Sequence, residues 1–366
     1  MINDLATDQR VHRVAKLLAA EGAEVICTGR SLPGSPEPEA LPFQIERFRM
    51  FFQRGPLFYA FYNWRLWWKL LVARKPDLFI SNDLDTLPAC YLAAKIRGIP
   101  LIYDSHEFFT ETPELIHRKR VRAVWLWIEA YLLPRISHAV TVNDSIATFY
   151  RRLYGTPFRV VRNMPERKEC KDREGHSEWR QGDQMIIYQG ALNVGRGLEL
   201  MIDAMQFLPG AHLVIAGSGD IEAELKERMV ERGVQERIEF VGRLLPKDLT
   251  GLTMQADLGI SLEEDRGLNY RYALPNKLFD YIQCRVPVLC SALPEMAWIV
   301  DSYGVGKTTL ERDPERMARI IEDMLKKSAA GAWNKALEKA AEDLCWEKEL
   351  EIYRDLLKEC GVIDQP

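Results

Sequence analysis

The stretch Tyr270-Arg-Tyr-Ala-Leu-Pro-Asn-Lys-Leu-Phe-Asp-Tyr281 reads as a loop that turns into a helix with polar side chains at its start. Pro275 marks the predicted helix start, where unpaired N–H groups and the positive end of the dipole attract anions. Asn276 and Lys277 would add donors and a cation for a phosphate. Asp280, about one helical turn further along, would accept hydrogen bonds from the hydroxyls of a ribose. Groups for a phosphate followed by a group for ribose hydroxyls favour a nucleotide as the ligand. The alternative is a plain helix start with a surface lysine.

Three further glycine-containing loops follow apolar runs in the same half of the chain. Gly190-Ala-Leu-Asn-Val-Gly-Arg-Gly197 places Arg196 near a helix start, where a guanidinium would hold phosphate. This loop is neither G-x-G-x-x-G nor a Walker A motif, which weakens the nicotinamide and P-loop interpretations. Ala216-Gly-Ser-Gly-Asp220 and Val241-Gly-Arg-Leu244 repeat the arrangement. Together they predict one extended anionic ligand, although each alone is also an ordinary strand-to-helix turn.

Short apolar runs alternate with helix-length segments, which predicts an α/β fold with two series of buried parallel strands. The predicted strands of the first series are residues 24–28, 77–81, 100–103, 138–142 and 158–161, and those of the second are 185–189, 213–216, 238–241, 257–261 and 286–291. Ligands bind at the carboxyl ends of such strands. The two sheets are therefore expected to face each other across a shared cleft.

With 366 residues, the chain is long enough for two domains. We predict a Rossmann-like domain over residues 1–165, a charged connection over 166–183, a second Rossmann-like domain over 184–331 and a helical segment over 332–366. Within this last segment, one helical pattern from 332 to 359 is expected to pack on the outside of one domain. The net charge is +6 for residues 1–162 and −10 for the rest, which sums to −4. The basic half is expected to meet an anionic partner.

Seven scattered cysteines without a C-x-x-C pair or nearby histidines favour reduced thiols in a cytoplasmic protein and predict no metal site. The chain opens without a signal-peptide pattern. No apolar run reaches the roughly 20 residues that a spanning helix requires. The protein is expected to be soluble or to lie on a membrane.

Residues 47–74 contain ten aromatic residues interleaved with arginine and lysine. This composition is typical of helices at a membrane interface, where rings lie at headgroup depth and cations meet anionic lipid. A buried helix with its aromatic residues facing the core is the alternative. A second cluster of Trp125, Trp127 and Tyr131 follows His117-Arg-Lys-Arg120 and favours the membrane interpretation.

The motifs in this order, G-x-L-x-x-x-(K/R)-G, A-G-x-G, V-G and P-N-K-L-F-(E/D)-Y followed by V-P-V, resemble the retaining GT-B glycosyltransferases of glycosyltransferase family 4, of the bacterial group 1 type. Asn3-Asp-Leu-Ala-Thr-Asp-Gln-Arg-Val-His12 and Tyr103-Asp-Ser-His-Glu107 are also similar to that group. The resemblance covers essentially the whole chain. It implies transfer of a sugar from a nucleotide diphosphate donor with retained configuration and without a metal or other cofactor.

The resemblance also implies roles for individual residues. The catalytic candidates are His106, beside the reacting carbon of the donor sugar, and Arg196 and Lys277, at the diphosphate. Asp280 matches the second acid of the family's E-x7-E motif, which holds the ribose. The full set of donor-binding candidates is Gly190, Asn193, Gly217, Arg243, Leu244, Asn276 and Asp280. Asp8 and Arg10 are candidates on the acceptor side.

Three departures from the family pattern matter. Ala191 replaces an arginine that contacts phosphate, and Asn193, Lys277 or Arg271 would have to compensate. Tyr272 replaces the first acid of E-x7-E, so the hydroxyls of the donor sugar must be recognised elsewhere, with Glu263, Glu264 and Asn269 as candidates. The family also has a strand before the Asn3-Asp4 loop. Either upstream residues are absent from this sequence or the first sheet lacks a central strand.

The expected activity is therefore glycosyl transfer to a glycan or lipid-linked acceptor, with donor on the C-terminal domain, acceptor on the N-terminal domain and closure bringing them together. A nucleotide-sugar epimerase on the same fold and a non-catalytic nucleotide-sugar-binding protein are the alternatives. Nucleic acid is not an expected partner. The expected location is the cytoplasm, with an anionic membrane surface as a docking partner for residues 47–74 at the inner face of the cytoplasmic membrane.

Overall fold

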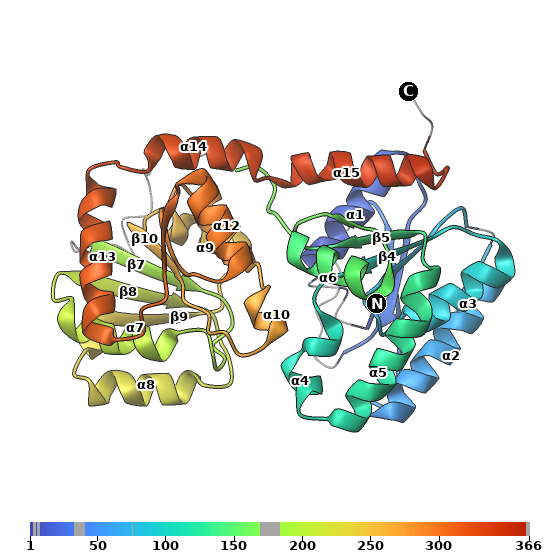
Figure 1. Ribbon diagram of the computed structural model, residues 1–366, viewed down its shortest axis with the longest axis horizontal. Helices are drawn as coiled ribbons and strands as arrows, with labels where there is room; N and C mark the ends of the chain where they lie inside the picture. The colour runs from blue at the N-terminus through green and yellow to red at the C-terminus, as the bar shows by residue number, and fades with distance from the viewer. Residues whose placement is uncertain (3–4, 6–7, 33–40, 75, 169–183, 364–366) are drawn as a thin grey trace. The chain divides into compact units, whose positions relative to one another are not determined.

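The structure, a computed structural model, describes residues 1–2, 5, 8–32, 41–74, 76–168 and 184–363 (Figure 1). The chain divides into an N-terminal unit, Met1–Asn163 with Glu349–Pro366, and a C-terminal unit, Met164–Lys348. Two predictions fall largely outside the described residues: the charged connection, from residue 169 onward, and the Asn3-Asp4 loop. Each unit contains its own parallel strands and helices.

The C-terminal unit is a six-stranded parallel sheet in the order β12-β11-β10-β7-β8-β9. Its strands are β7 (Gln184–Gln189), β8 (Ala211–Ala216), β9 (Ile238–Gly242), β10 (Leu258–Ser261), β11 (Val288–Ser291) and β12 (Gly306–Thr309). Its helices are α7 (Leu198–Ala204), α8 (Glu222–Glu231), α9 (Pro246–Thr253), α10 (Leu268–Arg271), α11 (Asn276–Gln283), α12 (Pro294–Tyr303), α13 (Pro314–Ala329) and α14 (Asn334–Asp343). This strand order is the doubly wound arrangement that the apolar runs predict.

Helices cover both faces of this sheet. Helix α7 contacts both α8 and α13, and α9, α12 and α14 each contact α11 or its neighbours in a second group. Right-handed crossovers put these groups on opposite faces, because the strand order reverses at β7. The central strands are therefore buried on both sides, which explains their continuous apolar sequences such as Met185-Ile-Ile-Tyr188.

The N-terminal unit is also built from parallel strands and helices. In chain order its elements are α1 (Gln9–Ala20), β1 (Ile26–Arg30), β2 (Gln44–Phe48), α2 (Pro56–Val72), β3 (Phe79–Asn82), α3 (Leu87–Arg97), β4 (Leu101–Ser105), η1 (Phe109–Glu111), α4 (Pro113–Ile116), α5 (Lys119–Leu132), β5 (His138–Thr141), α6 (Asp144–Tyr154) and β6 (Phe158–Val160). Helix α15 (Trp346–Glu359) begins in the C-terminal unit, and from Glu349 onward the chain belongs to the N-terminal unit. There Glu349 accepts a hydrogen bond from the Arg162 N–H at 2.6 Å.

The strands of this unit form two separate sheets. Strands β1 and β2 pair with each other, and β3-β4-β5-β6 form a four-stranded sheet. Among the described residues, no strand joins β1 to β3. The first residues lie along β1: the Met1 ammonium donates to Thr28 O at 2.7 Å, and Ile2 O accepts from Arg30 at 2.8 Å.

Three details differ from the sequence-based expectations. Strands β2 and β12 were not predicted, because Gln44-Ile-Glu-Arg-Phe48 and Gly306-Lys-Thr-Thr309 are edge strands without an apolar run. The single helix expected from 332 to 359 is two helices, α14 and α15, interrupted at Leu344 and Cys345. Gln283 stabilises this break by donating to the carbonyls of Ala341 and Leu344, which a continuous helix would use itself.

The sequence predicts that the last helical segment packs on one domain, but in the structure the segment is divided between both units. Helix α14 belongs to the C-terminal unit, whereas the chain from Glu349 belongs to the N-terminal unit. Arg354 on α15 pairs with Glu21 at 2.7 Å, and Arg159 pairs with Glu359. The segment therefore contributes to both units.

Candidate functional site

The sheet of the C-terminal unit reverses its order between β7 and β10. In such sheets the loops that leave neighbouring strands diverge at this point and leave room for a ligand. Residues 190–197 follow β7, and residues 262–267 follow β10. The two loops touch, because Glu264 N–H donates to Gly195 O at 2.9 Å. The glycine loop and the residues before Tyr270 therefore meet at the place where the fold admits a ligand.

The glycines predicted at these loops allow close backbone packing. Gly217 has a φ of +151°, and a Cβ there would overlap the carbonyl oxygen of Gly190. A Cβ at Gly197, with a φ of +74°, would overlap the carbonyl oxygen of Leu262. The N–H groups of Gly190 and Gly217 donate to Ala216 O and Gly242 O, at 2.9 and 2.8 Å. These two glycines extend the sheet, so their own N–H groups are already hydrogen-bonded.

Lys277 and Arg196 both face one oxygen of a buried carboxylate. Lys277 Nζ lies 2.8 Å from Glu263 Oε1, and Arg196 Nη1 lies 3.8 Å from the same oxygen. Glu263 has no exposed surface, and only 7% of the Lys277 side chain is exposed. Lys277 is therefore not the surface lysine of the alternative interpretation. The structure brings together the two cations that the sequence predicts at a phosphate.

The Glu263 carboxylate is held in its ionised form. Burial by itself raises the pKa of a carboxyl, but Lys277 and the Ser261 hydroxyl, which donates at 2.7 Å, lower the pKa of Glu263 below its ordinary value. Lys277 Nζ also lies 4.0 Å from the centre of the Tyr188 ring. Arg196 Nε is buried and has no hydrogen-bond partner among the described residues. The guanidinium therefore retains a donor for a ligand.

Asp280 lies on the same helix as Lys277 and is held by two side chains. Gln189 Nε2 donates to Asp280 Oδ2 at 3.0 Å, and Lys168 Nζ donates to Oδ1 at 3.4 Å. Thr253 in turn donates to Gln189 Oε1 at 2.8 Å, which orients the amide. Both carboxylate oxygens of Asp280 are therefore held by side chains of the same unit, which fixes the orientation of the carboxylate.

The other predicted donor-binding residues lie at strand ends of this unit. Asn193 accepts a long contact of 3.5 Å from Asp220 N–H, which ties the loop after β7 to the loop after β8. Asn276 is the first residue of α11. Arg243 is exposed just after β9, whereas Leu244 packs against the core. The structure gives Arg243 no contact with the Lys277 cluster.

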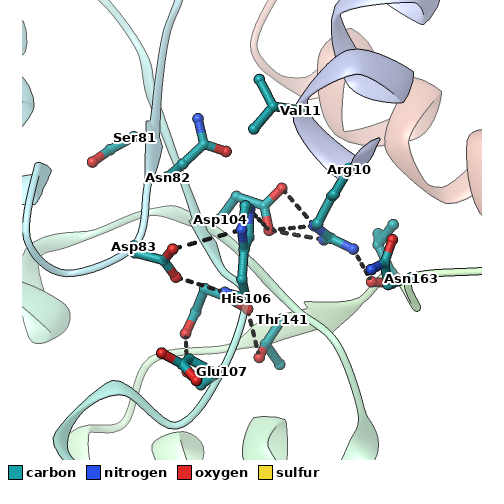
Figure 2. Close-up of polar contacts among 12 residues, drawn as sticks. Arg10, Val11, Ser81, Asn82, Asp83, Asp104, His106, Glu107, Thr141 and Asn163 are labelled. Carbon is teal, nitrogen blue, oxygen red and sulfur yellow. Dashed lines mark hydrogen bonds and ion pairs between the residues drawn. The ribbon is translucent and has the colours of Figure 1, made fainter. Parts of the chain in front are cut away.

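A second polar cluster lies at the ends of β3 and β4 in the N-terminal unit. Figure 2 shows His106 between two aspartates: Nδ1 lies 3.6 Å from Asp83 Oδ2, and Nε2 lies 3.7 Å from Asp104 Oδ1. His106 N–H donates to Asp83 Oδ1 at 2.9 Å. Asp83 has a φ of +60°, a conformation that few residues other than glycine adopt. Burial raises the pKa of Asp83, and His106 opposes part of that rise.

Arg10 and Asp8, predicted on the acceptor side, both make contacts within the protein. Arg10 is buried and forks onto Asp104, with Nη2 2.8 Å from Oδ1, while its Nη1 donates to Val161 O at 2.7 Å (Figure 2). Asp8 caps α1 by accepting from Val11 N–H at 3.0 Å. The structure thus connects Arg10 to His106 through Asp104 and assigns Asp8 a capping contact.

Two family profiles match almost the whole chain. The profile described as Glycosyltransferase Family 4 matches residues 8–164, and the profile described as Glycosyl transferases group 1 matches residues 171–343. The chain belongs to the group 1 glycosyltransferases of the GT-B fold. A curated relative, the uncharacterised glycosyltransferase MJ1607 of Methanocaldococcus jannaschii, is 23% identical over half of this chain, and the match spans 46% of the relative's length.

Solved structures of glycosyltransferases share this fold along the full chain. HepE of Anabaena, solved with UDP-glucose, matches with a TM-score of 0.73 and 15% identity over 98% of both chains. Sucrose-phosphate synthase of Thermosynechococcus elongatus matches with a TM-score of 0.78 and 17% identity over 96% of this chain and 93% of that one. WaaG, described as involved in lipopolysaccharide biosynthesis, matches with a TM-score of 0.69 and 17% identity over 100% and 98%.

Two departures from the group 1 glycosyltransferase pattern lie in different loops of the C-terminal unit: Ala191 follows β7, and Tyr272 lies between β10 and α11. Arg271, considered as a substitute phosphate cation, is half exposed and pairs with Asp265 at 2.6 Å. Glu264 pairs with Arg266 at 3.3 Å. Glu263, a candidate for recognition of the sugar hydroxyls, instead faces Lys277 and Arg196. Tyr272 ends the short helix α10.

Four residues that support the two polar clusters carry no local sequence signal. Gln189 is the last residue of a predicted strand, and no motif includes its side chain. Lys168 fell in the predicted connection, so its contact with Asp280 had no local pattern. Asp83 follows β3 without a motif. Arg312, far along the chain, donates to Leu262 O, Glu263 O and Ser291 Oγ at 2.8 to 3.0 Å and holds the loop after β10.

Within the described residues, no group of three or more His, Cys, Asp or Glu side chains lies close enough to hold a metal ion. The aspartates around His106 are instead compensated by Arg10 and by backbone donors. Among the described residues, Arg10 thus neutralises Asp104, whereas the cations Lys277 and Arg196 share the single carboxylate of Glu263.

Proposed function

We propose that this glycosyltransferase moves a sugar from a nucleotide diphosphate donor to a glycan or lipid-linked acceptor, with retention of configuration and without a metal. The donor would bind the C-terminal unit and the acceptor the N-terminal unit. The observation that carries the donor assignment is the pair of cations, Lys277 and Arg196, at the switch point of the sheet, with Asp280 one turn further along α11. The UDP and UDP-glucose complexes of HepE support a nucleotide-sugar donor.

In this reaction the bond between the anomeric carbon and the diphosphate oxygen breaks, and a bond to an acceptor hydroxyl oxygen forms. The leaving phosphate takes the proton of that hydroxyl on the same face, so no protein nucleophile is needed. Negative charge grows on the leaving diphosphate, where Arg196 and Lys277 would stabilise it. His106, held by Asp83, would contact the donor sugar near the reacting carbon.

Substitution of Arg196 tests the assignment most directly. We expect Arg196→Ala to lower kcat by about a hundredfold or more, since it removes a cation from a developing charge. Lys326→Ala is the matched control, because Lys326 is exposed and pairs only with Glu322 on its own helix. Near-normal turnover in both Arg196→Ala and Lys277→Ala variants would rule out the proposed donor site.

The donor base can be identified by a thermal-shift panel of UDP-, GDP-, ADP- and dTDP-sugars, because a ligand that binds the folded state raises its melting temperature. Product analysis without an acceptor separates transfer from epimerisation, the alternative chemistry on this fold. An isomerised nucleotide sugar as the only product would establish the epimerase. Absence of both hydrolysis and transfer with every donor that binds would leave the non-catalytic binding protein.

We further propose that the protein docks on an anionic membrane surface at the inner face of the cytoplasmic membrane. No described helix is long and apolar enough to cross a bilayer. Helix α2 buries Phe58, Tyr62 and Leu66 but turns Trp64 and Trp68, each 57% exposed, to solvent. One face of α2 is therefore part of the core, as the buried-helix alternative for residues 47–74 expects, and the other face is exposed. The exposed face is the surface that we propose meets the membrane.

The neighbouring helices α3 and α5 extend the exposed apolar surface of α2. Helix α3 contacts both α2 and α5, and Tyr59 on α2 packs against Trp125 on α5 with ring centres 5.1 Å apart (Figure 1). We call the exposed apolar residues of these helices the aromatic face: Leu57, Trp64, Trp68, Val72, Leu92, Ile96, Val121, Val124, Trp127 and Tyr131. Trp125 was expected on this surface but is buried.

The charges around the aromatic face are almost all positive. Helices α2, α3 and α5 contain seven Lys and Arg residues and one acid, Glu129, which has no exposed surface. Lys69 and Arg122 pair with Glu46 and Glu111 of neighbouring segments. Among the described residues, no carboxylate pairs with the other cations of these helices. Aromatic rings among cations fit the interface of an anionic bilayer.

Vesicle sedimentation tests the membrane proposal. Wild-type protein is expected to bind vesicles that contain phosphatidylglycerol, with affinity falling as salt rises, and to bind phosphatidylcholine vesicles weakly. The Trp64→Ala/Trp127→Ala variant is expected to bind at least about tenfold more weakly. Trp298→Ala is the matched control, since Trp298 is 51% exposed in the C-terminal unit. Equal binding by all three proteins, or no binding to anionic vesicles, would overturn it.

A further inference from the structure

Glu263 is the most completely buried charged residue of the candidate donor site. It lies two residues after Ser261, the last residue of β10, and has no exposed surface. Its carboxylate faces Lys277, Arg196 and Ser261. Its own backbone is fixed as well, because Arg312 donates to Glu263 O at 2.8 Å. Both the side chain and the main chain of Glu263 are therefore held in place by surrounding residues.

The position of Glu263 does not suit recognition of sugar hydroxyls. One carboxylate oxygen accepts from Ser261, and the other faces the two cations, so the protein already surrounds the group. A lysine that is nine-tenths buried, as Lys277 is, needs a counter-charge in the absence of ligand. Glu263 supplies that counter-charge and determines where the Lys277 ammonium lies.

We propose that Glu263 is a positioning residue that holds Lys277 and Arg196 at the diphosphate subsite, and that it does not read the donor sugar. This inference rests on the proposed function. Glu263 has two effects on a bound diphosphate. It aims the ammonium of Lys277, which favours catalysis, and its negative charge lies close to the phosphates, which weakens their binding. The site therefore carries one net positive charge from three groups.

These effects predict a separation of binding from turnover. In Glu263→Gln the charge that opposes the diphosphate is gone, so the nucleoside diphosphate is expected to bind about tenfold more tightly. The amide no longer anchors Lys277 as a carboxylate does, so kcat is expected to fall about tenfold or more. Loss of a sugar-reading group would behave differently: affinity for the diphosphate would stay unchanged, and only the affinity for the sugar donor would fall.

The experiment measures calorimetric dissociation constants and kcat for wild type, Glu263→Gln and Ser261→Ala. The probe is the diphosphate that most raises the melting temperature of wild type among UDP, GDP, ADP and dTDP. Ser261→Ala keeps the charge but removes the hydroxyl that orients it, so diphosphate affinity is expected to stay within about twofold while kcat falls severalfold. This milder variant keeps the test decisive if Glu263→Gln does not fold.

The outcomes separate this inference from the proposed function. Tighter diphosphate binding with lower kcat in Glu263→Gln, or lower kcat at constant affinity in Ser261→Ala, supports the positioning role. Unchanged diphosphate affinity with a specific loss of sugar-donor affinity overturns it and assigns Glu263 to the sugar. A wild-type protein that binds none of the four diphosphates overturns the proposed function, and this inference with it.

Discussion

The two polar clusters of this glycosyltransferase stand at equivalent places, the carboxyl ends of parallel strands, but carry opposite charge. In the C-terminal unit two cations, Lys277 and Arg196, share one buried carboxylate. In the N-terminal unit two buried aspartates flank one histidine, and Arg10 neutralises one of them. The same strand-end position thus hosts a site suited to phosphates in one unit and one unsuited to phosphates in the other.

This contrast shows how buried charge is compensated in each cluster. Lys277 and Arg10 are both buried cations that face a buried carboxylate. Arg10 satisfies Asp104 through two nitrogens and also donates to Val161 O, so its contacts are complete within the protein. Arg196 retains an unpartnered buried nitrogen. The Arg10 pair therefore fits a structural role, whereas the Lys277 cluster fits the donor site that we propose.

The largest expected effect comes from breaking the Arg10 pair. Arg10→Leu leaves Asp104 buried without its partner, which typically costs about 3–5 kcal/mol of unfolding free energy. Urea denaturation measures this loss. Nucleotide affinity of the remaining folded protein is expected to equal that of wild type, because Arg10 lies in the N-terminal unit. A variant with wild-type stability would show that the Arg10 pair is not a structural contact.

One source of the pH dependence of stability is expected to be Glu129 in the N-terminal unit. Burial raises its pKa from 4.5 to about 7, against opposing hydrogen bonds from Tyr154, Tyr150 and Thr110. Because the folded state holds this proton more tightly than the unfolded state does, protonated Glu129 stabilises the folded state, and this contribution is fully present below pH 4.5. That contribution is lost as pH rises to about 7, by roughly 3 kcal/mol at most.

Denaturation of wild type and Glu129→Gln between pH 4.5 and 8 checks this dependence. The glutamine cannot ionise, so the variant is expected to lose less stability over that range than wild type. Parallel pH profiles for the two proteins would mean that Glu129 ionises normally in the folded state.

A smaller effect is expected at Asp83, and it falls on turnover. Asp83→Asn keeps a residue that tolerates the φ of +60° and can still accept from His106 N–H. It removes the negative charge 3.6 Å from His106 Nδ1, so kcat is expected to fall about 10- to 100-fold with an altered pH profile. Calorimetry with the nucleoside diphosphate is expected to show unchanged affinity. Weaker nucleotide binding would contradict the separation of the two clusters.

The smallest effect is expected at Arg271. Its guanidinium pairs with the Asp265 carboxylate in solvent and belongs to neither cluster. Arg271→Ala is expected to change diphosphate affinity less than about threefold, because exposed ion pairs contribute little. A tenfold loss would instead identify Arg271 as the cation that replaces the family arginine at Ala191.

The sequence predicted the architecture of the C-terminal unit closely, because its central strands are buried on both faces and therefore read as continuous apolar runs. It missed β2 and β12 because edge strands need few apolar residues. It also joined α14 to α15, since the break depends on Gln283, a residue about sixty positions away along the chain. Contacts of this kind leave no local pattern.

The sequence by itself determined the family and the strand-to-helix rhythm. It also singled out the site candidates Lys277, Arg196, Asp280 and His106, because each stands in a short local motif. Only the tertiary structure decided what surrounds them. Glu263 became the counter-charge of Lys277, Gln189 the support of Asp280, and Asp83 the neighbour of His106. The physical reason is that burial and charge pairing depend on which strand ends lie side by side, and that is a property of the sheet and not of any segment.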